Sequence, residues 1–138
     1  MSRKTLRLAL AAFFAAVFGA VAMASPAQAG TIGGYRDDYN PAGCDGMVYV
    51  SDTTMSGRVE TFGGFNCPPG AKMIGYVQIY LYKNGSQVCK GGANYNGVST
   101  FSTSCSVANS SGSQAWKAKL QIFDIYGDRY ITTGELWT

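Results

Sequence analysis

The sequence predicts a small all-β domain, an antiparallel sandwich or barrel of six to seven strands. One observation is the stretch Tyr76 to Tyr82, where aliphatic side chains alternate with polar or aromatic ones, the period of two that a pleated strand requires. Another is Asn84-Gly85, a pair that suits the two positive φ angles of a type I′ hairpin turn. The third is that no helical period follows Met23. An immunoglobulin-like sandwich is one member of the predicted class.

The first 29 residues have the layout of a secretory signal peptide. A basic start at Arg3 to Arg7 precedes an uncharged apolar run from Leu8 to Met23, and Ala27-Gln28-Ala29 is a small-x-small cleavage site. The run is shorter than the roughly 20 apolar residues that span a bilayer. We therefore expect a mature chain that begins at Gly30, is secreted to the extracellular space and keeps no membrane anchor.

Removing the signal peptide would leave a mature chain without net charge. The full sequence has 11 Lys and Arg residues and eight Asp and Glu residues. Three of the cations, Arg3, Lys4 and Arg7, belong to the predicted signal peptide, so the remaining eight cations balance the eight anions. Binding to nucleic acid depends on an excess of cations, and we therefore expect no nucleic-acid partner.

Four cysteines in an exported chain of this size predict two disulfides, because a small body buries only a modest share of its surface. Three pairings are open. We favour Cys44 with Cys67, which bracket a predicted turn at 53–57. We also favour Cys89 with Cys105, which are symmetric about a Tyr-Asn-Gly sequence and would face each other in one hairpin. All spacings exceed those of the close pairs that hold zinc, so no metal is expected.

The mature chain divides into an arm and one β-domain. Residues 30–46 are rich in Gly, Asp, Asn and Pro and lack apolar periodicity, which predicts an irregular arm. Residues 47–138 are predicted to form a single β-domain. Its first strand is 47–52, in which valines alternate with a tyrosine, and its second is 58–65, where Gly63-Gly64 indicates a bulge or the end of the strand.

The remaining strands are predicted by alternation and by the turn residues that separate them. After a Pro-Pro-Gly stop, the central hairpin consists of residues 72–82 and 86–90. A Ser- and Thr-rich strand with one solvent-facing side is predicted at 98–107. Residues 115–126 form a second long strand with its tryptophan in the core, and 129–137 close the chain.

Few side chains of the mature chain suit catalysis, and we expect no enzymatic activity and no cofactor. The chain has no His, which removes the commonest general base, and oxidised cysteines cannot act as nucleophiles. Asp124 and Asp128 flank the last predicted turn, where turn chemistry favours Asp; a carboxylate pair for glycoside hydrolysis is the alternative. The oxygen-rich stretch 37–45 does not match the spacing of an EF-hand.

Tyr76, Tyr80 and Tyr82 share one face of the central strand and form the candidate binding surface. Alternate strand residues lie roughly 6.6 Å apart, so solvent-facing rings would make a flat stacking surface with hydroxyls at its edge. If the strand 115–126 lies beside them, its lysines would cover the rings by cation–π contact. Packing of the rings across the sheet is the alternative. Trp137, one residue from the end, is a secondary candidate.

These observations predict a secreted, non-catalytic β-domain that binds an extracellular protein or polysaccharide through an aromatic surface. The alternative is a small secreted inhibitor or toxin that acts through an exposed loop such as 67–72 or 109–114, because a disulfide-anchored loop loses less entropy on binding. A carboxylate-dependent hydrolase is the third hypothesis.

Overall fold

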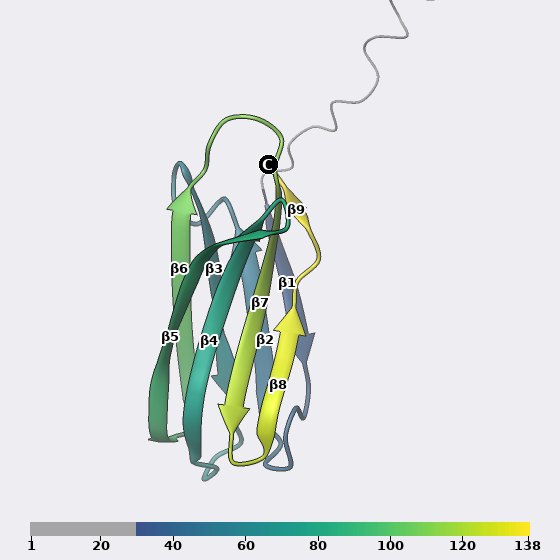
Figure 1. Ribbon diagram of the computed structural model, residues 1–138. Coiled ribbons are helices and arrows are strands. Elements are labelled where there is room, and N and C mark those ends of the chain that lie inside the picture. The colour runs from purple at the N-terminus through teal and green to yellow at the C-terminus, as the bar shows by residue number, and fades with distance from the viewer. Residues whose placement is uncertain (1–29) are drawn as a thin grey trace, which may run out of the picture.

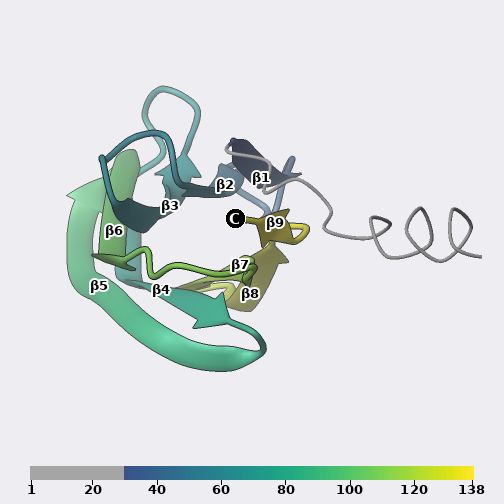
Figure 2. The same ribbon diagram turned by 90° about the horizontal axis from the view of Figure 1, so that it is seen from above.

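The structure, a computed structural model, describes residues 30–138, which form two antiparallel sheets that face each other (Figures 1 and 2). The predicted all-β class is therefore confirmed. The predicted signal peptide, residues 1–29, lies outside the described residues. Among residues 30–138, no helix is long and apolar enough to cross a lipid bilayer.

One sheet, which we call sheet A, has four strands in the order β1-β2-β3-β6. Its strands are β1 (Thr31–Arg36), β2 (Asp45–Ser51), β3 (Arg58–Asn66) and β6 (Thr100–Ala108). The first three strands follow one another as a meander. Strand β6 pairs with the free edge of β3 after the chain has formed two strands of the other sheet.

The other sheet, sheet B, has the order β5-β4-β7-β8, with a short fifth strand, β9, paired to the start of β7. Its strands are β4 (Met73–Lys83), β5 (Ser86–Val98), β7 (Ala115–Asp124), β8 (Gly127–Thr132) and β9 (Leu136–Trp137). In Figure 2 the interior between the sheets is bordered by β5 and β6 at one edge and by β1 and β8 at the other.

The core lies between the sheets and is built by the alternation along the strands. Val77, Ile79 and Leu81 of β4 have no exposed surface, as the period of two predicts. Full burial of each of these side chains contributes about 1.5–3 kcal/mol to folding. The tryptophan of β7 that the sequence places in the core, Trp116, is also fully buried. Sheet A faces them with the buried side chains of Val48, Val50 and Val59.

Both predicted disulfides are present. Cys44 bonds to Cys67 and Cys89 bonds to Cys105. Cys44 directly precedes β2 and Cys67 directly follows β3, next to the paired residues Asp45 and Asn66 at the open end of that hairpin. The first disulfide therefore closes the hairpin whose turn the sequence predicts.

The geometry of the second disulfide differs from the prediction. Strand β5 pairs with β4 along almost its whole length, and β6 pairs with β3, so Cys89 and Cys105 do not face each other in one hairpin. They lie on the edge strands of different sheets. Strand β5 continues through Gly91 and Gly92 because its backbone follows the long partner strand β4. A Cβ atom at Gly91 would collide with the carbonyl oxygen of Ser104, so glycine permits this close approach of β5 to β6.

The predicted irregular arm, residues 30–46, is wrong over its first part, because Thr31–Arg36 forms β1 and pairs with β2. The glycines in this strand interrupt the side-chain alternation that indicates a strand, and their lack of a side chain permits close packing. The ring of Tyr49 lies over Gly33, and a Cβ atom at Gly34 would collide with the carbonyl oxygen of Thr132 in β8. Glycine here brings the edge of sheet A against the edge of sheet B.

Nine strands are present among residues 30–138, rather than the predicted six to seven. The first additional strand is β1. The second is β9, because the predicted strand 129–137 is divided into β8 and β9. The bulge or strand end predicted at Gly63-Gly64 is also wrong, since the pairing of β3 with β2 and β6 continues through both glycines in unbroken register and β3 ends at Asn66.

Candidate functional site

All four predicted binding residues lie on the outer face of sheet B. In the register of β4 with β7, Tyr76 is opposite Phe123, Tyr80 opposite Lys119 and Tyr82 opposite Lys117. Trp137 of β9 is paired with Ala115 and extends the same face beyond the start of β7. We call this surface the aromatic face; its other members are Gln78, Lys90, Gln121, Asp128 and Tyr130.

The rings of the aromatic face differ in their exposure. Tyr76, Tyr80 and Tyr82 are half-buried, because neighbouring side chains on the sheet cover part of each ring. Phe123 is 42% exposed and Trp137 is 48% exposed. The tyrosines thus pack across the sheet and also present ring surface to solvent, so both sequence-based interpretations describe part of their surroundings.

Gln121 is the centre of a hydrogen-bond network on this face. Its Oε1 accepts a hydrogen bond from the hydroxyl of Tyr80 at 3.1 Å. Its Nε2 donates to Asp128 Oδ1 at 2.9 Å and to the hydroxyl oxygen of Tyr130 at 3.0 Å. The Tyr80 hydroxyl also approaches Gln78 Oε1 at 2.5 Å. Three strands are connected in this way, which restricts the motion of the rings.

The burial of Tyr80 also affects its ionisation. Desolvation raises the pKa of the Tyr80 hydroxyl above its ordinary value, and the charges of neighbouring tyrosines and Asp128 add to the shift. The hydroxyl therefore stays protonated at neutral pH and acts as a hydrogen-bond donor.

Stacking and cation–π contacts complete the aromatic face. The rings of Tyr76 and Phe123 stack with centroids 5.2 Å apart and an interplanar angle of 15°. The Lys119 ammonium lies 4.1 Å from the centroid of Tyr130. Tyr80 is contacted instead by Lys90 of β5, at 5.6 Å. Strand β7 lies beside β4, as the predicted cation–π contact requires. Lys119 of β7, however, contacts the ring of Tyr130 in β8 rather than a tyrosine of β4.

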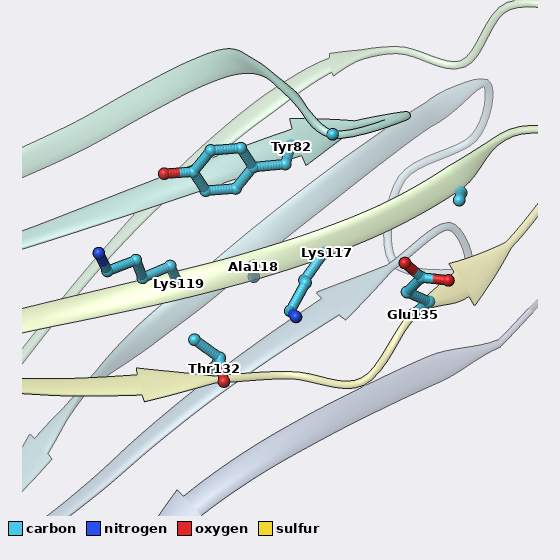
Figure 3. A pocket seen from close by; sticks show the side chains of 8 residues that line it. Tyr82, Lys117, Ala118, Lys119, Thr132 and Glu135 are labelled. Atoms are coloured by element: carbon cyan, nitrogen blue, oxygen red, sulfur yellow. The ribbon is translucent and has the colours of Figure 1, made fainter.

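The aromatic face contains a pocket of about 290 Å³ near the turn that joins β4 to β5 (Figure 3). It is lined by Tyr82, Gly85, Ala115, Lys117, Ala118, Lys119, Thr132 and Glu135. A second hollow of about 260 Å³ lies at the other end of the face, beside Tyr76 and Gln78. Gly92 lies opposite Gln78 and leaves this hollow without a side chain of its own.

Sequence patterns alone did not identify three members of the site. Tyr130 comes to the face because the turn at Ile125-Tyr126 places it opposite Gln121. Gln121 alternates with Lys119 and Phe123, yet nothing in the sequence distinguishes it as the centre of a network. Lys90 lies opposite Tyr80 because the register of β4 with β5 shifts by one residue between Leu81 and Tyr82. The position of the last turn is the signal that would have indicated Tyr130. The register shift that places Lys90 depends on the pairing of β5 with β4 and has no signal of its own in the sequence.

The two aspartates that flank the last turn do not form a carboxylate pair. Asp124 points into the sandwich, where its Oδ2 accepts a hydrogen bond from Asn40 Nδ2 at 2.8 Å. Its Oδ1 accepts a hydrogen bond from the backbone N–H of Tyr126 at 2.7 Å, as turn chemistry predicts. Asp128 points to the opposite side of sheet B and contacts Gln121.

Among residues 30–138, no group of three or more His, Cys, Asp or Glu side chains could hold a metal ion. The side chain of Asn40, in the oxygen-rich stretch 37–45, instead forms hydrogen bonds within the protein. Its Oδ1 accepts hydrogen bonds from the backbone N–H groups of Ala42 and Cys44, at 3.1 and 3.3 Å. This side chain organises the loop before β2.

Comparison with known proteins finds no matching family model, no similar curated protein and no similar solved structure. The function proposed below therefore rests on the chemistry of the aromatic face.

Proposed function

We propose that this chain is a secreted, non-catalytic β-domain that binds an extracellular protein or polysaccharide through the aromatic face. The observation that carries the proposal is the gathering of Tyr76, Tyr80, Tyr82, Tyr130 and Trp137 on one side of one sheet. Aromatic rings with polar tips are the side chains that contribute most to contact surfaces, because one part of each ring is apolar and the other forms hydrogen bonds.

The restricted motion of the rings in the free protein favours binding. Conformational freedom that is lost on association weakens a complex, by roughly 0.5–1.5 kcal/mol for each flexible side chain that is immobilised. The bonds around Gln121 and the stack of Tyr76 on Phe123 restrict the rings in the free protein. A ligand that binds to this face would therefore cost little further conformational freedom of the rings.

Secretion is supported by the layout of residues 1–29 and by the two disulfides. Disulfides persist in oxidising compartments and are rare in the reducing cytosol. A binding function outside the cell also agrees with a small domain that is stabilised covalently as well as by its core.

We also infer that the sandwich has immunoglobulin-like connectivity. The order β2-β3-β6 in sheet A matches strands A-B-E of that architecture, and the order β5-β4-β7-β8 in sheet B matches strands C′-C-F-G. Strand β1 is then an additional strand at the edge. The aromatic face corresponds to the C′-C-F-G sheet in this comparison.

A small secreted inhibitor or toxin is the second candidate, favoured by the loop that follows Cys67. Pro68, Pro69 and Gly70 are exposed, and the Cys44–Cys67 disulfide anchors the start of the loop. A panel of secreted proteases and glycosidases tests inhibition directly, and growth of competing microbes tests toxicity. Activity that is lost when residues 68–72 are replaced by a Gly-Ser sequence would favour this candidate.

The experiment for the leading proposal measures binding of the exported chain to glycan and extracellular-protein arrays. Tyr82→Ala and Trp137→Ala alter the aromatic face, and Tyr49→Ala is the matched control, because Tyr49 is 38% exposed on the outer face of sheet A. We expect the first two changes to weaken binding at least about tenfold, which is usual for aromatic contact residues, and the control to bind normally. Equal losses in all three variants, or no loss in the first two, would refute the proposal.

A further inference from the structure

We propose that the ligand is an acidic polysaccharide and that the pocket beside Tyr82 holds one uronic acid unit of the polymer. This inference depends on the proposed function, because it concerns the ligand of the same face. It follows from the chemistry of the pocket walls, from the distribution of charge over the two sheets and from the linear arrangement of the rings.

The pocket has the size for one sugar unit rather than for a larger ligand. Its volume of about 290 Å³ is at the small end of the roughly 300–1,000 Å³ typical of ligand sites. Residues from β4, β7, β8 and the segment before β9 surround it. Figure 3 shows the ring of Tyr82 along one side and Lys117 between Lys119 and Glu135.

Each wall matches a different part of a uronic acid unit. The ammonium group of Lys117 can donate hydrogen bonds to the sugar carboxylate, and such charge-assisted bonds are the stronger kind. The ammonium group of Lys119 lies over the ring of Tyr130 and adds positive charge beside the pocket. The carboxylate of Glu135 can accept hydrogen bonds from sugar hydroxyls. The ring of Tyr82 offers an apolar surface for the C–H side of the sugar. A neutral sugar would leave the Lys117 ammonium without a partner from the ligand, and a simple polyanion would place its negative charge against Glu135.

The distribution of charge over the two sheets favours an anionic ligand here. Three of the five lysines among residues 30–138, namely Lys90, Lys117 and Lys119, belong to the aromatic face. Asp128 and Glu135 oppose these three lysines, which leaves the aromatic face with an excess of one cation. On the outer face of sheet A, Asp45 and Glu60 outnumber Arg58, which leaves an excess of one anion. In a chain without net charge after residue 29, this separation attracts an anionic polymer to one side of the molecule.

The face is also shaped for a linear polymer. Four cross-strand pairs of β4 and β7 follow one another along the strands, and each pair is separated from the next by roughly 6.6 Å. They are Tyr82 with Lys117, Tyr80 with Lys119, Gln78 with Gln121, and Tyr76 with Phe123. The pocket lies at the first pair and the second hollow at the last pairs. A polysaccharide along this row would contact first the two pairs that contain lysine, then the glutamine pair and last the aromatic pair.

The test compares binding of tetragalacturonate with binding of maltotetraose, a neutral tetrasaccharide, by calorimetry on the exported chain. We expect tetragalacturonate to bind and maltotetraose to bind at least about tenfold more weakly, the loss expected for one charge-assisted hydrogen bond. Lys117→Gln/Lys119→Gln should reduce tetragalacturonate binding by at least the same factor. Lys72→Gln is the control, because Lys72 is an exposed lysine outside the pocket.

Glu135→Ala separates uronate recognition from general attraction between charges. If Glu135 accepts sugar hydroxyls, its removal weakens tetragalacturonate binding severalfold, although a negative charge has been removed. Binding of inorganic polyphosphate, which has charge but no sugar hydroxyls, should then be unchanged or stronger. Tighter tetragalacturonate binding by Glu135→Ala would overturn the inference, because it would show attraction between charges alone.

The outcomes distinguish this inference from the proposed function. Equal binding of both tetrasaccharides, lost in Tyr82→Ala but not in the double lysine variant, would overturn the acidic ligand and support the aromatic face. Failure of both sugars to bind, together with a protein ligand that depends on Tyr82, would do the same. Failure of every ligand to depend on Tyr82 and Trp137 would refute both.

Discussion

Cys89 in β5 and Cys105 in β6 join the edge strand of sheet B to the edge strand of sheet A, where no backbone ladder connects the two sheets. The other disulfide has a different position. Cys44 and Cys67 close a hairpin within sheet A and are buried, with 0% and 7% of their surface exposed. One bond therefore ties the sheets to each other, and the other reinforces a single hairpin.

The two disulfides should be reduced in a defined order. Cys89 and Cys105 are half-buried at the edge, so a small thiol reaches them more easily than it reaches the buried pair. We expect low dithiothreitol under native conditions to open Cys89–Cys105 first, as measured by alkylation and mass spectrometry. Loss of this 16-residue closure should lower the free energy of unfolding by about 3 kcal/mol.

Cys89→Ser/Cys105→Ser is the matched variant for this prediction. It should reproduce the stability of the partly reduced protein and show no further change at low dithiothreitol. If alkylation appeared first at Cys44 and Cys67, or at all four positions together, exposure would not control the order of reduction.

The elements that the sequence predicts well are those in which local pattern and tertiary contacts agree. The alternation of Val77, Ile79 and Leu81 places them in the core, and Asn84 and Gly85 adopt the positive φ values, 49° and 81°, that their turn requires. Both signals are contained in a few neighbouring residues. They therefore need no knowledge of the partner strand.

The elements that the sequence does not predict depend on partners distant in the chain. Glycine in Thr31–Arg36 and at Gly91-Gly92 removes the side-chain alternation, although the backbone is held in strands by β2 and β4. The aromatic face shows the same limit. Tyr76, Tyr80 and Tyr82 could be placed on one side of a strand, but the role of Gln121 arises only when three strands meet.

Asn40→Ala should destabilise the fold by about 2 kcal/mol, since it removes a hydrogen bond to a buried carboxylate. The change would leave Asp124 Oδ2 without its 2.8 Å donor and the backbone N–H groups of Ala42 and Cys44 without their acceptor. Urea unfolding at neutral pH measures the effect. Asn66→Ala, at an exposed asparagine at the end of β3, is the control and should change stability by no more than about 0.5 kcal/mol.

A cost for Asn40→Ala as small as that of the control would show that the Asn40–Asp124 contact does not hold the loop before β2. Asp124→Asn provides a second measure. It keeps the size of the side chain but removes its charge, so a smaller loss than in Asn40→Ala is expected.

Gln121→Ala should loosen the aromatic face while the fold persists. The change removes one of the two acceptors near the Tyr80 hydroxyl, since Gln78 Oε1 remains, and it removes the donor to Tyr130 and Asp128. The expected cost is about 2 kcal/mol for several partly buried bonds. Nuclear magnetic resonance of the tyrosine rings would report increased motion at Tyr80 and Tyr130. Gln78→Ala is the comparison, since Gln78 contacts only the hydroxyl of Tyr80 in this network.

Unchanged ring dynamics in Gln121→Ala would contradict the role of Gln121 as the centre of the network. In that case packing, rather than hydrogen bonding, would place the tyrosines. Ligand affinity measured on the same variants would then show whether ring order contributes to binding.

The stability of the protein should fall at alkaline pH because of two buried tyrosines. Burial raises the pKa of Tyr39 and of Tyr95 above the ordinary value of 10.0, and Asp124 adds to the shift of each. Above about pH 10 the unfolded chain releases protons that the folded chain retains. Each of the two side chains then lowers the free energy of unfolding by up to about 1.4 kcal/mol for each pH unit above that point. Below about pH 10 the tyrosines are protonated in both the folded and the unfolded chain, so this loss of stability does not occur.

Tyr39→Phe gives the sharpest test of this pH dependence. The hydroxyl of Tyr39 is buried without a hydrogen-bond partner among the described residues, so its removal should cost nothing at neutral pH and should flatten the alkaline slope. Tyr95→Phe should also flatten the slope, but it loses the 3.1 Å bond to the carbonyl oxygen of Phe123 and about 1 kcal/mol at neutral pH. Urea unfolding from about pH 8 to about pH 11, with Tyr49→Phe as an exposed control, measures all three variants. An alkaline slope that is the same in Tyr39→Phe as in the unaltered chain would assign the loss of stability to groups other than the buried tyrosines.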